Sequence, residues 1–513
     1  MNTFKKKSLN AALAGLTVVG AVGAAQAVNV NPDGLGQVLL YPYYTTRADN
    51  AGNTFSTLIN VVNSTQTTKA VKVRFIEGKN SQEVLDFNLF LSPYDVWSGN
   101  IVPNLTTGGA KIVTDDTSCT LPPIPSANDA ANPTRKQKDF VNYKYAGTNP
   151  DKADTSLDRT REGYVEIIEM ANFAPFDTTF EVTLHSTTDE KGAALAVATP
   201  DCGTGKILGP SYVGALNDNT AANEADPVQG GLFGSSMLIN VSSGTDYAAN
   251  PTVLDNFATG VRLYANAGTT SPDLSNVTPK FSVVIANNAI VESDWTAGLA
   301  VDPVSAVLMH DQVLNEFVVG ANIGASTDWV VTFPTKRYYV KTGTGAAAFG
   351  LFQKNFDGNN GSCDDISLNI YDREEQTTST PLEFSPPPPT GTSSLCWEAN
   401  ILNFNGTNVF GSKNDPKQNV NTSFGAGWLN LGFFPQTVLD AGPPTHRLGN
   451  NTTWAYAIGS APPTNPSTYT YYGLPLIGFA AIGFQYGALP IAGGTAVSNY
   501  GGTFAHKVTT LIQ

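Results

Sequence analysis

The sequence predicts a mainly β protein, built from antiparallel β-sandwich units with long loops and little helix. Charged residues make up only 14% of the 513 residues, against roughly 25% in ordinary soluble domains. Thr, Asn, Ser and Gly replace them, as on the outer strand faces of exported β proteins. In Glu83–Leu91, apolar side chains at Leu85, Phe87 and Leu89 alternate with polar ones. This period of two, between turns rich in Asn, Gly, Ser and Pro, is typical of an antiparallel sandwich.

The N-terminal part reads as a series of strands separated by polar turns. Strands are expected at Gln37–Thr45, Phe55–Asn63, Ala70–Glu77, Glu83–Leu91, Gly163–Phe173 and Thr179–Ser186. Within the third of these, Lys72 and Arg74 alternate with apolar residues, which predicts a solvated face on that strand.

The later part contains further strands and one helix candidate. Strands are expected at Lys280–Ala286 and Trp329–Phe333. The near-helical spacing of apolar residues within Ser305–Val319 favours a helix there. The apolar tail Leu474–Ala492 contains several glycines and prolines, so it is interpreted as a buried strand rather than a lipid-spanning helix.

Composition divides the chain into a leader and three regions. Residues 1–27 are expected to be a signal peptide, and residues 28–210 an N-terminal β-sandwich with a disulfide-tethered loop. Residues 211–345 form a second β-rich region, and residues 346–513 a C-terminal β-rich region.

The leader predicts export. Lys5–Lys7 precede an apolar run, Leu9–Ala25, and Ala25–Ala27 has the small-x-small pattern of a cleavage site, so Val28 is the expected mature N-terminus. A membrane anchor is the alternative, but no stop-transfer charges follow. The mature chain is therefore expected outside the cell or on its surface, with the periplasm as an alternative, and without a transmembrane helix.

The net charge excludes one class of partner. Cleavage removes three lysines and no acid, which changes the net charge from −14 to −17. Nucleic acid would repel such a chain, because no basic patch offsets its field.

The four cysteines, Cys119, Cys202, Cys363 and Cys396, predict two disulfides in an exported chain. Three connectivities are open. Pairing Cys119 with Cys202 and Cys363 with Cys396 is favoured, because each bond then closes a loop within one region. Zinc is disfavoured, since the sequence has no CxxC spacing and no His near these residues.

No catalytic residue is predicted. The sequence contains no nucleophile elbow and no phosphate-binding loop, and its four histidines are dispersed. Glu166 and Glu169 have odd spacing in one expected strand, so they should face opposite sides of the sheet. Solvation is the expected state of both.

Calcium is the one cofactor that the sequence suggests. Asp357, Asn359, Asp364 and Asp365 lie around Cys363 in a Gly-rich stretch, and Ca²⁺ prefers such oxygen ligands. The spacing departs from the EF-hand pattern, and a plain polar turn is the alternative.

Aromatic side chains suggest a carbohydrate platform. Tyr41, Tyr43 and Trp97 are the candidates, since aromatic rings can stack on sugars. Core packing is the alternative, because most such rings fill cores or cover strand faces.

Five segments resemble exported proteins of Gram-negative bacteria that are usually left uncharacterised or called cell-surface proteins. They are LYPYYT, KAVKVRFIEGKNSQEVLDFNLFLSPYDVW, VLMHDQVLNEF, TDWVVTFPTKRYYV and NYGGTFAHK. The resemblance implies secretion and a surface location, and it implies no activity, cofactor or catalytic residue.

Together these observations favour an exported cell-surface structural or adhesive protein. It would assemble with its own copies or with other surface components through uncovered β-strand edges. A secreted carbohydrate-binding or polysaccharide-active protein is one alternative, and an outer-membrane β-barrel is another.

Overall fold

The structure is a computed structural model whose description covers most of the chain. The described residues are 26–174, 183, 185, 200, 202–203, 225–320, 323–343, 350–377, 393–414, 419–433 and 446–513. The expected signal peptide, apart from residues 26 and 27, and most of the expected strand Thr179–Ser186 lie outside them.

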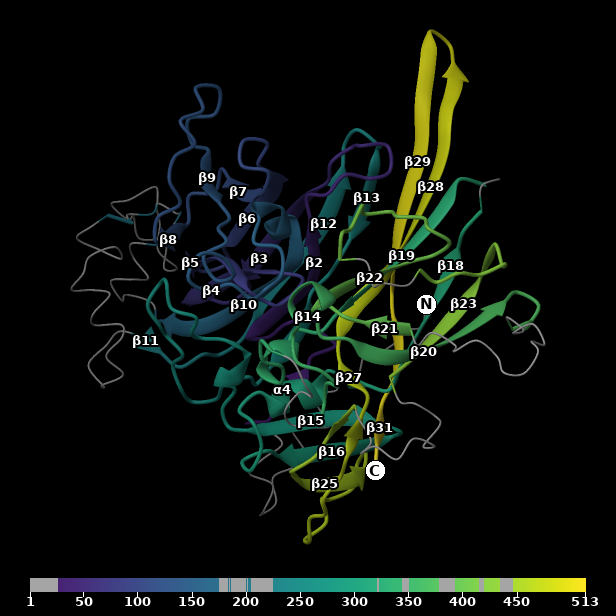
Figure 1. Ribbon diagram of the computed structural model, residues 1–513. Coiled ribbons are helices and arrows are strands. Elements are labelled where there is room, and N and C mark those ends of the chain that lie inside the picture. Colours follow the sequence, from purple (N-terminus) through teal and green to yellow (C-terminus); the bar gives the residue numbers. More distant parts are fainter. Residues whose placement is uncertain are drawn as a thin grey trace, which may run out of the picture.

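The fold is mainly β, as the sequence predicted, and its first layer is an eight-stranded antiparallel sheet (Figure 1). Its strands follow the order β1 (Asn29–Val30), β14 (Thr252–Asp255), β2 (Val38–Thr45), β10 (Glu162–Phe173), β4 (Thr68–Glu77), β5 (Glu83–Leu91) and β8 (Cys119–Leu121), with β11 (Ala225–Asp226) paired to β10.

The second layer is a six-stranded sheet. Its order is β13 (Thr245–Ala248), β12 (Leu232–Asn240), β3 (Ser56–Asn63), β6 (Val96–Pro103), β7 (Ala110–Thr114) and β9 (Lys136–Asp139). Apolar side chains from both sheets, among them Val73, Leu89 and Ile112, form one buried core between the layers. The N-terminal part is therefore a β-sandwich.

The sheets cross the expected boundary near residue 211. Strands β12 and β13 extend the sheet of β3, and β14 pairs with β2. The N-terminal sandwich thus includes strands up to Asp255.

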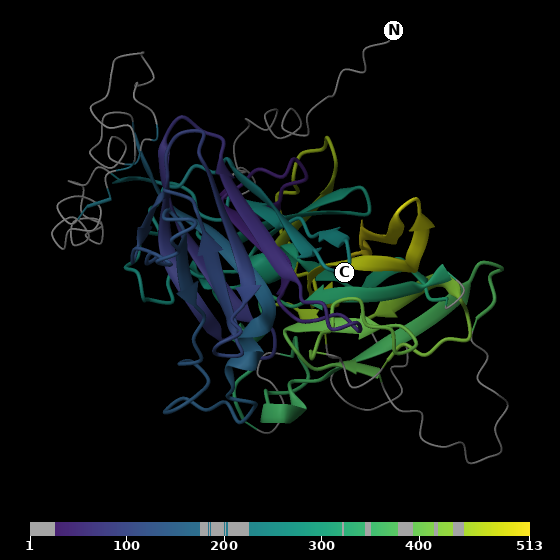
Figure 2. The same cartoon turned by 90° about the horizontal axis from the view of Figure 1, so that it is seen from above.

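The C-terminal part, green to yellow in Figure 2, lies beside the N-terminal sandwich. It contains two larger sheets and three small ones. The five-stranded sheet is β21 (Ser393–Leu395), β20 (Asp364–Asp372), β23 (Ala426–Gly432), β18 (Gln312–Val318) and β30 (Lys507–Thr509). The four-stranded sheet is β22 (Ala399–Asn403), β19 (Ala325–Thr332), β28 (Ile477–Ile491) and β29 (Gly494–Ala505).

Three small sheets complete the C-terminal part. They are β15 (Phe281–Ala286) with β16 (Ala289–Asp294) and β25 (Thr452–Ala457), then β24 (Arg447–Leu448) with β26 (Tyr471–Tyr472) and β31 (Leu511–Ile512), and β17 (Met309–His310) with β27 (Leu474–Pro475). The short helices are η2 (Leu157–Arg161), η3 (Leu274–Asn276), α4 (Asp302–Val307), η5 (Lys336–Tyr338) and η6 (Gly358–Asn360).

The expected helix at Ser305–Val319 is wrong beyond its first turn. Helix α4 ends at Val307, and β17 and β18 follow. Apolar residues at Met309, Val313 and Phe317 are four apart, and a spacing of four also places them on one face of a strand. The spacing of these apolar residues therefore could not distinguish a helix from a strand.

The two halves of the chain share their cores. Val38, Leu40 and Ile168, on the outer face of the eight-stranded sheet, belong to one apolar cluster with Trp295 and Val331 of the C-terminal part. A second cluster joins Tyr43 and Leu238 to C-terminal residues. The outer face of the first sheet is therefore an interior surface.

This covering corrects the solvated face predicted for Lys72 and Arg74. Both side chains are fully buried. Lys72 forms an ion pair with Asp86, and Arg74 forms ion pairs with Glu166 and with Glu83, the last at 2.8 Å. The alternation was real, but the second face is covered by protein rather than water.

Candidate functional site

The three aromatic side chains suggested for carbohydrate are all buried. Tyr41 and Tyr43 are 0% exposed and Trp97 is 1% exposed. The Tyr41 hydroxyl donates to Asn60 O, and the Tyr43 hydroxyl donates to Glu162 Oε2 at 2.9 Å. Trp97 packs against Phe87 in the sandwich core. These rings fill the interior, which corrects the expectation of a sugar-stacking platform.

The residues suggested for calcium do not converge on one point. Asp364 is buried on β20, and its carboxylate lies 2.9 Å from Lys336 Nζ and 3.4 Å from His446 Nε2. Asn359 is exposed, Asp357 accepts from Asn360 within its own turn, and Asp365 is half-buried. Within the described ranges, no group of three or more His, Cys, Asp or Glu residues could hold a metal ion. The arrangement corresponds to the polar-turn alternative.

Asp364 is part of a compensated internal charge pair. Its burial favours the neutral acid, but Lys336 and His446 outweigh this effect and hold the pKa of Asp364 below its usual value. A cation at this position would have to displace the Lys336 ammonium.

The two disulfides have the favoured pairing. Cys119 is bonded to Cys202, and Cys363 to Cys396. Both bonds therefore close loops within one part of the chain.

Glu166 and Glu169 face opposite sides of the eight-stranded sheet, as predicted, but neither is solvated. Glu166 reaches Arg74 on the outer face, whereas Glu169 lies 2.8 Å from Lys69 Nζ. Both glutamates are 0% exposed.

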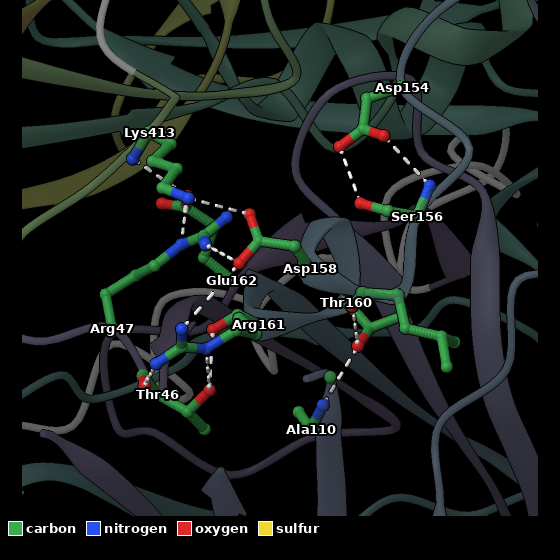
Figure 3. Close-up of polar contacts among 12 residues, drawn as sticks. Thr46, Arg47, Ala110, Asp154, Ser156, Asp158, Thr160, Arg161, Glu162 and Lys413 are labelled. Carbon is green, nitrogen blue, oxygen red and sulfur yellow. Dashed lines mark hydrogen bonds and ion pairs between the residues drawn. The ribbon is translucent and has the colours of Figure 1, made fainter. Parts of the chain in front are cut away.

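An ionic cluster joins the N-terminal sandwich to the loop before residue 415 (Figure 3). Glu162, at the start of β10, accepts from Arg47 Nε at 2.9 Å and from Ser412 Oγ at 2.5 Å. Asp158 accepts from Arg47 at 2.6 Å and from Lys413 Nζ at 3.1 Å. The two acids thus hold cations from both halves of the chain.

The electrostatics of this cluster suit a structural role. Burial tends to raise the pKa of Glu162, but Arg47 and the hydrogen bonds from Ser412, Lys413 and Tyr43 lower it overall. Glu162 is therefore ionised and fully hydrogen-bonded, and a proton-transfer group would need the opposite properties.

A polar hollow of about 730 Å³ lies beside the first residues of β25. It is lined by Asp294, Thr296, Ala297, Asn450, Asn451, Thr452 and Thr468. Asp294 already accepts from the Thr296 backbone and hydroxyl, and the lining contains no aromatic ring. This hollow presents no arrangement of nucleophile and base.

The β28–β29 hairpin is the feature that internal packing does not explain. It projects beyond the sandwich as a long two-stranded arm (Figure 1). Strand β19 pairs with β28 only as far as Phe484, and the last described backbone bond to the body is Gln485 N–H to Gly324 O at 2.8 Å. On the other strand, Asn499 Nδ2 donates to Ser243 O.

Beyond these contacts, the pairing that the structure describes joins the two strands to each other. Their register runs from Gln485 opposite Asn499 to Ile491 opposite Gly494. For residues 486–498, which we call the arm, the part of the chain that the structure describes contains no strand paired to either outer edge. Each edge therefore carries backbone donors and acceptors that a further strand could use.

The comparisons with known proteins add no relative. No protein-family model matches this chain, and no curated protein or solved structure matches it. Among the residues that the structure describes, no helix is long and apolar enough to cross a membrane.

Proposed function

We propose that this chain is an exported cell-surface structural or adhesive protein whose copies associate through the arm, residues 486–498. The observation that supports this most directly is the projecting hairpin, whose two edges pair with no other strand of the described residues. A long strand edge that no other element covers, and that carries no charged side chains, readily pairs with another strand.

The composition of the hairpin favours association rather than solvation. Residues 477–505 contain no Asp, Glu, Lys, Arg or His, although the whole chain has 43 acids and 29 basic residues. Edge strands that remain single usually carry inward-pointing charges, lysines or bulges. Here only Pro490 and the register shift after Gln485 interrupt the strand edges.

The occupant that fits best is a second copy of this chain. Copies of the mature chain, each with a net charge of −17, repel one another over most of their surface. The arm is a place where two copies can approach without bringing like charges together. Antiparallel pairing of one arm with its copy is self-complementary, because backbone hydrogen bonds need no particular side chains.

Two disulfides support the exported location that this proposal needs. Such bonds persist in oxidising compartments and are rare in the cytosol. Cell fractionation together with N-terminal sequencing tests this part, and a mature chain beginning at Val28 is the expected result. A protein that stays in the cytosol with Met1 intact would contradict it.

Arm truncation tests the association. Gln485 and Asn499 face each other in register, so an Asn-Gly turn can replace residues 486–498 without disturbing the sheet below. We expect the full chain to associate in a concentration-dependent way and the truncated chain to be monomeric, as measured by sedimentation velocity.

A variant in the arm, with a matched control elsewhere, distinguishes association through the arm from non-specific hydrophobic association. Ala492→Lys with Ser498→Lys adds two charges to the arm, and charged side chains are one means by which single edge strands avoid pairing. Leu105→Lys changes an apolar side chain that is 89% exposed elsewhere on the surface. Association should be lost only in the arm variant. Equal association of all variants, or a full chain that is monomeric at every concentration, would refute the arm as the contact.

A further inference from the structure

Three buried polar side chains meet inside the N-terminal sandwich, at one end of the β4–β10 pair. Lys69 lies on β4 directly opposite Asn172 on β10. Its Nζ is 2.6 Å from Asn172 Oδ1 and 2.8 Å from Glu169 Oε1. All three residues are 0% exposed. We call Lys69, Glu169 and Asn172 the buried trio.

A β-bulge brings the two β10 members together. Glu169 and Asn172 are three residues apart, so in a regular strand they would face opposite sides. The register shifts between Glu169 and Ala171, which leaves Met170 as an extra residue. Both side chains then reach the Lys69 amine.

The Asn172 amide is oriented and polarised. Its Nδ2 donates to Pro227 O at 2.6 Å, which determines which atom of the amide faces the lysine. Its Oδ1 accepts from Lys69 Nζ and also from Thr67 Oγ1 at 3.1 Å. The Thr67 hydroxyl would therefore still stabilise negative charge on Oδ1 if the lysine nitrogen turned to attack the adjacent carbon.

The Glu169 carboxylate is held as a base beside the amine. Backbone N–H groups of Gln229 and Gly230 donate to it at 3.1 and 2.7 Å. One oxygen, Oε1, faces the Lys69 ammonium. The amine thus contacts both a base and the oxygen of a polarised amide in a site without exposed surface, and these are the groups that nucleophilic acyl substitution needs.

From these contacts we propose that Lys69 and Asn172 become joined by an intramolecular amide bond, with Glu169 as the catalytic base and acid. Glu169 takes a proton from the Lys69 ammonium. The neutral Nζ attacks Asn172 Cγ, and a bond forms between these atoms. The Cγ–Nδ2 bond then breaks, Nδ2 receives the proton from Glu169 and departs as ammonia, and the second Nζ proton is lost with it to give ammonium. Nothing is oxidised or reduced.

The environment favours this product. The backbone N–H groups of Gln229 and Gly230 still donate to the Glu169 carboxylate after the ammonium has become an amide. Exclusion of water disfavours the competing hydrolysis of Asn172 to an acid. The bond would join residues 103 positions apart on two central strands of the eight-stranded sheet. It would therefore act like a further disulfide, but one that reducing agents do not break.

Mass spectrometry of the full chain tests the bond directly. We expect an intact mass lower by one ammonia than the sequence with its two disulfides requires. Trypsin should yield one branched species containing residues 48–72 and 162–191, because acylated Lys69 is no longer a cleavage site. Succinimide formation elsewhere would also release ammonia, so the branched peptide is the decisive product. Normal cleavage after Lys69 with an intact Asn172 would overturn the proposal.

Glu169→Gln tests the role of the base, and Glu166→Gln is its matched control on the other face of β10. General-base catalysis typically contributes about 100-fold or more. We therefore expect the linked fraction at a fixed time after synthesis to form about 100-fold more slowly in E169Q and at an unchanged rate in E166Q. Equal rates in both variants would show that Glu169 is not the base. If E169Q does not fold, the peptide map of the unchanged chain still decides whether the bond exists.

Discussion

Glu398 shows at the scale of one residue how burial changes the chemistry of a carboxyl group. It is 1% exposed, and its Oε2 has no hydrogen-bond partner among the described residues. Burial raises the pKa of Glu398 to about 8, with a further contribution from Glu77, although Lys336 and Ser81 oppose the shift. The side chain is therefore mostly protonated at neutral pH, whereas in the unfolded chain it would be ionised.

This raised pKa predicts that stability falls as pH rises. Between the usual value of 4.5 and about 8, the folded protein binds a proton that the unfolded chain has released. The contribution of Glu398 is therefore fully present below 4.5 and declines by up to about 1.4 kcal/mol per pH unit across that window. Glu398→Gln should remove this decline. Urea unfolding of both proteins across the window measures the difference, and parallel pH profiles would contradict the prediction.

The buried charges were also where sequence reasoning was least successful. Lys72, Arg74, Glu166 and Glu169 appeared in strands with apolar neighbours, and solvation was the simplest interpretation. Their partners lie on other strands, so no local pattern could show that they are paired and buried. One signal was available in the sequence. One strand carries two basic residues and another carries two acids, in a chain where charged residues are few.

At the scale of elements, strands were predicted well because alternation is a local property. Predicted Glu83–Leu91 coincides with β5, and Gln37–Thr45 differs from β2 by one residue. The arm was anticipated only as an apolar strand, Leu474–Ala492. Pairing with β19 ends at Phe484, and the sequence carries no mark of where a strand leaves its sheet.

The close approach of β10 and β4 predicts how much one added methyl group between them lowers the free energy of unfolding. Gly163 lies where β10 crosses close to β4, and a Cβ there would meet Ile76 O at 1.9 Å. We expect Gly163→Ala to destabilise the protein by about 2 kcal/mol or more, because the backbone of a central strand must move. Chemical denaturation measures this.

Gly449→Ala is the matched control for this substitution. A Cβ at Gly449 would meet no heavy atom within 4 Å, and its backbone has no positive φ. We expect an unchanged unfolding midpoint for this control. Similar midpoints for both alanine variants would mean that β10 and β4 do not approach as closely as described.

At the scale of the whole molecule, the chain has three compositional regions but continuous cores. Apolar clusters contain residues from both halves, and the sheet around β2 and β3 takes strands from beyond residue 225. Composition could not reveal this, because strand pairing between distant segments depends on the complete fold. Because the halves share these clusters, we expect them to unfold in one cooperative transition.

The ionic cluster around Glu162 tests that cooperativity. Glu162→Ala would leave Arg47, with a side chain 3% exposed, without its Nε partner, and breaking a buried pair costs about 3–5 kcal/mol. Because Glu162 also accepts from Ser412 and from the Lys413 backbone, both halves lose a contact. We expect one calorimetric transition that moves to lower temperature without splitting.

Lys413→Ala provides the control within the same cluster. Its side chain is 64% exposed, and exposed ion pairs contribute only about 0–1 kcal/mol, so the transition should hardly move. Two separate transitions in Glu162→Ala, with only one of them shifted, would show that the halves unfold independently. A single shifted transition would mean that the ionic cluster and the shared cores hold the N-terminal sandwich and the C-terminal sheets together as one unit. A force applied to the arm, which extends from a C-terminal sheet, would then act on the whole protein.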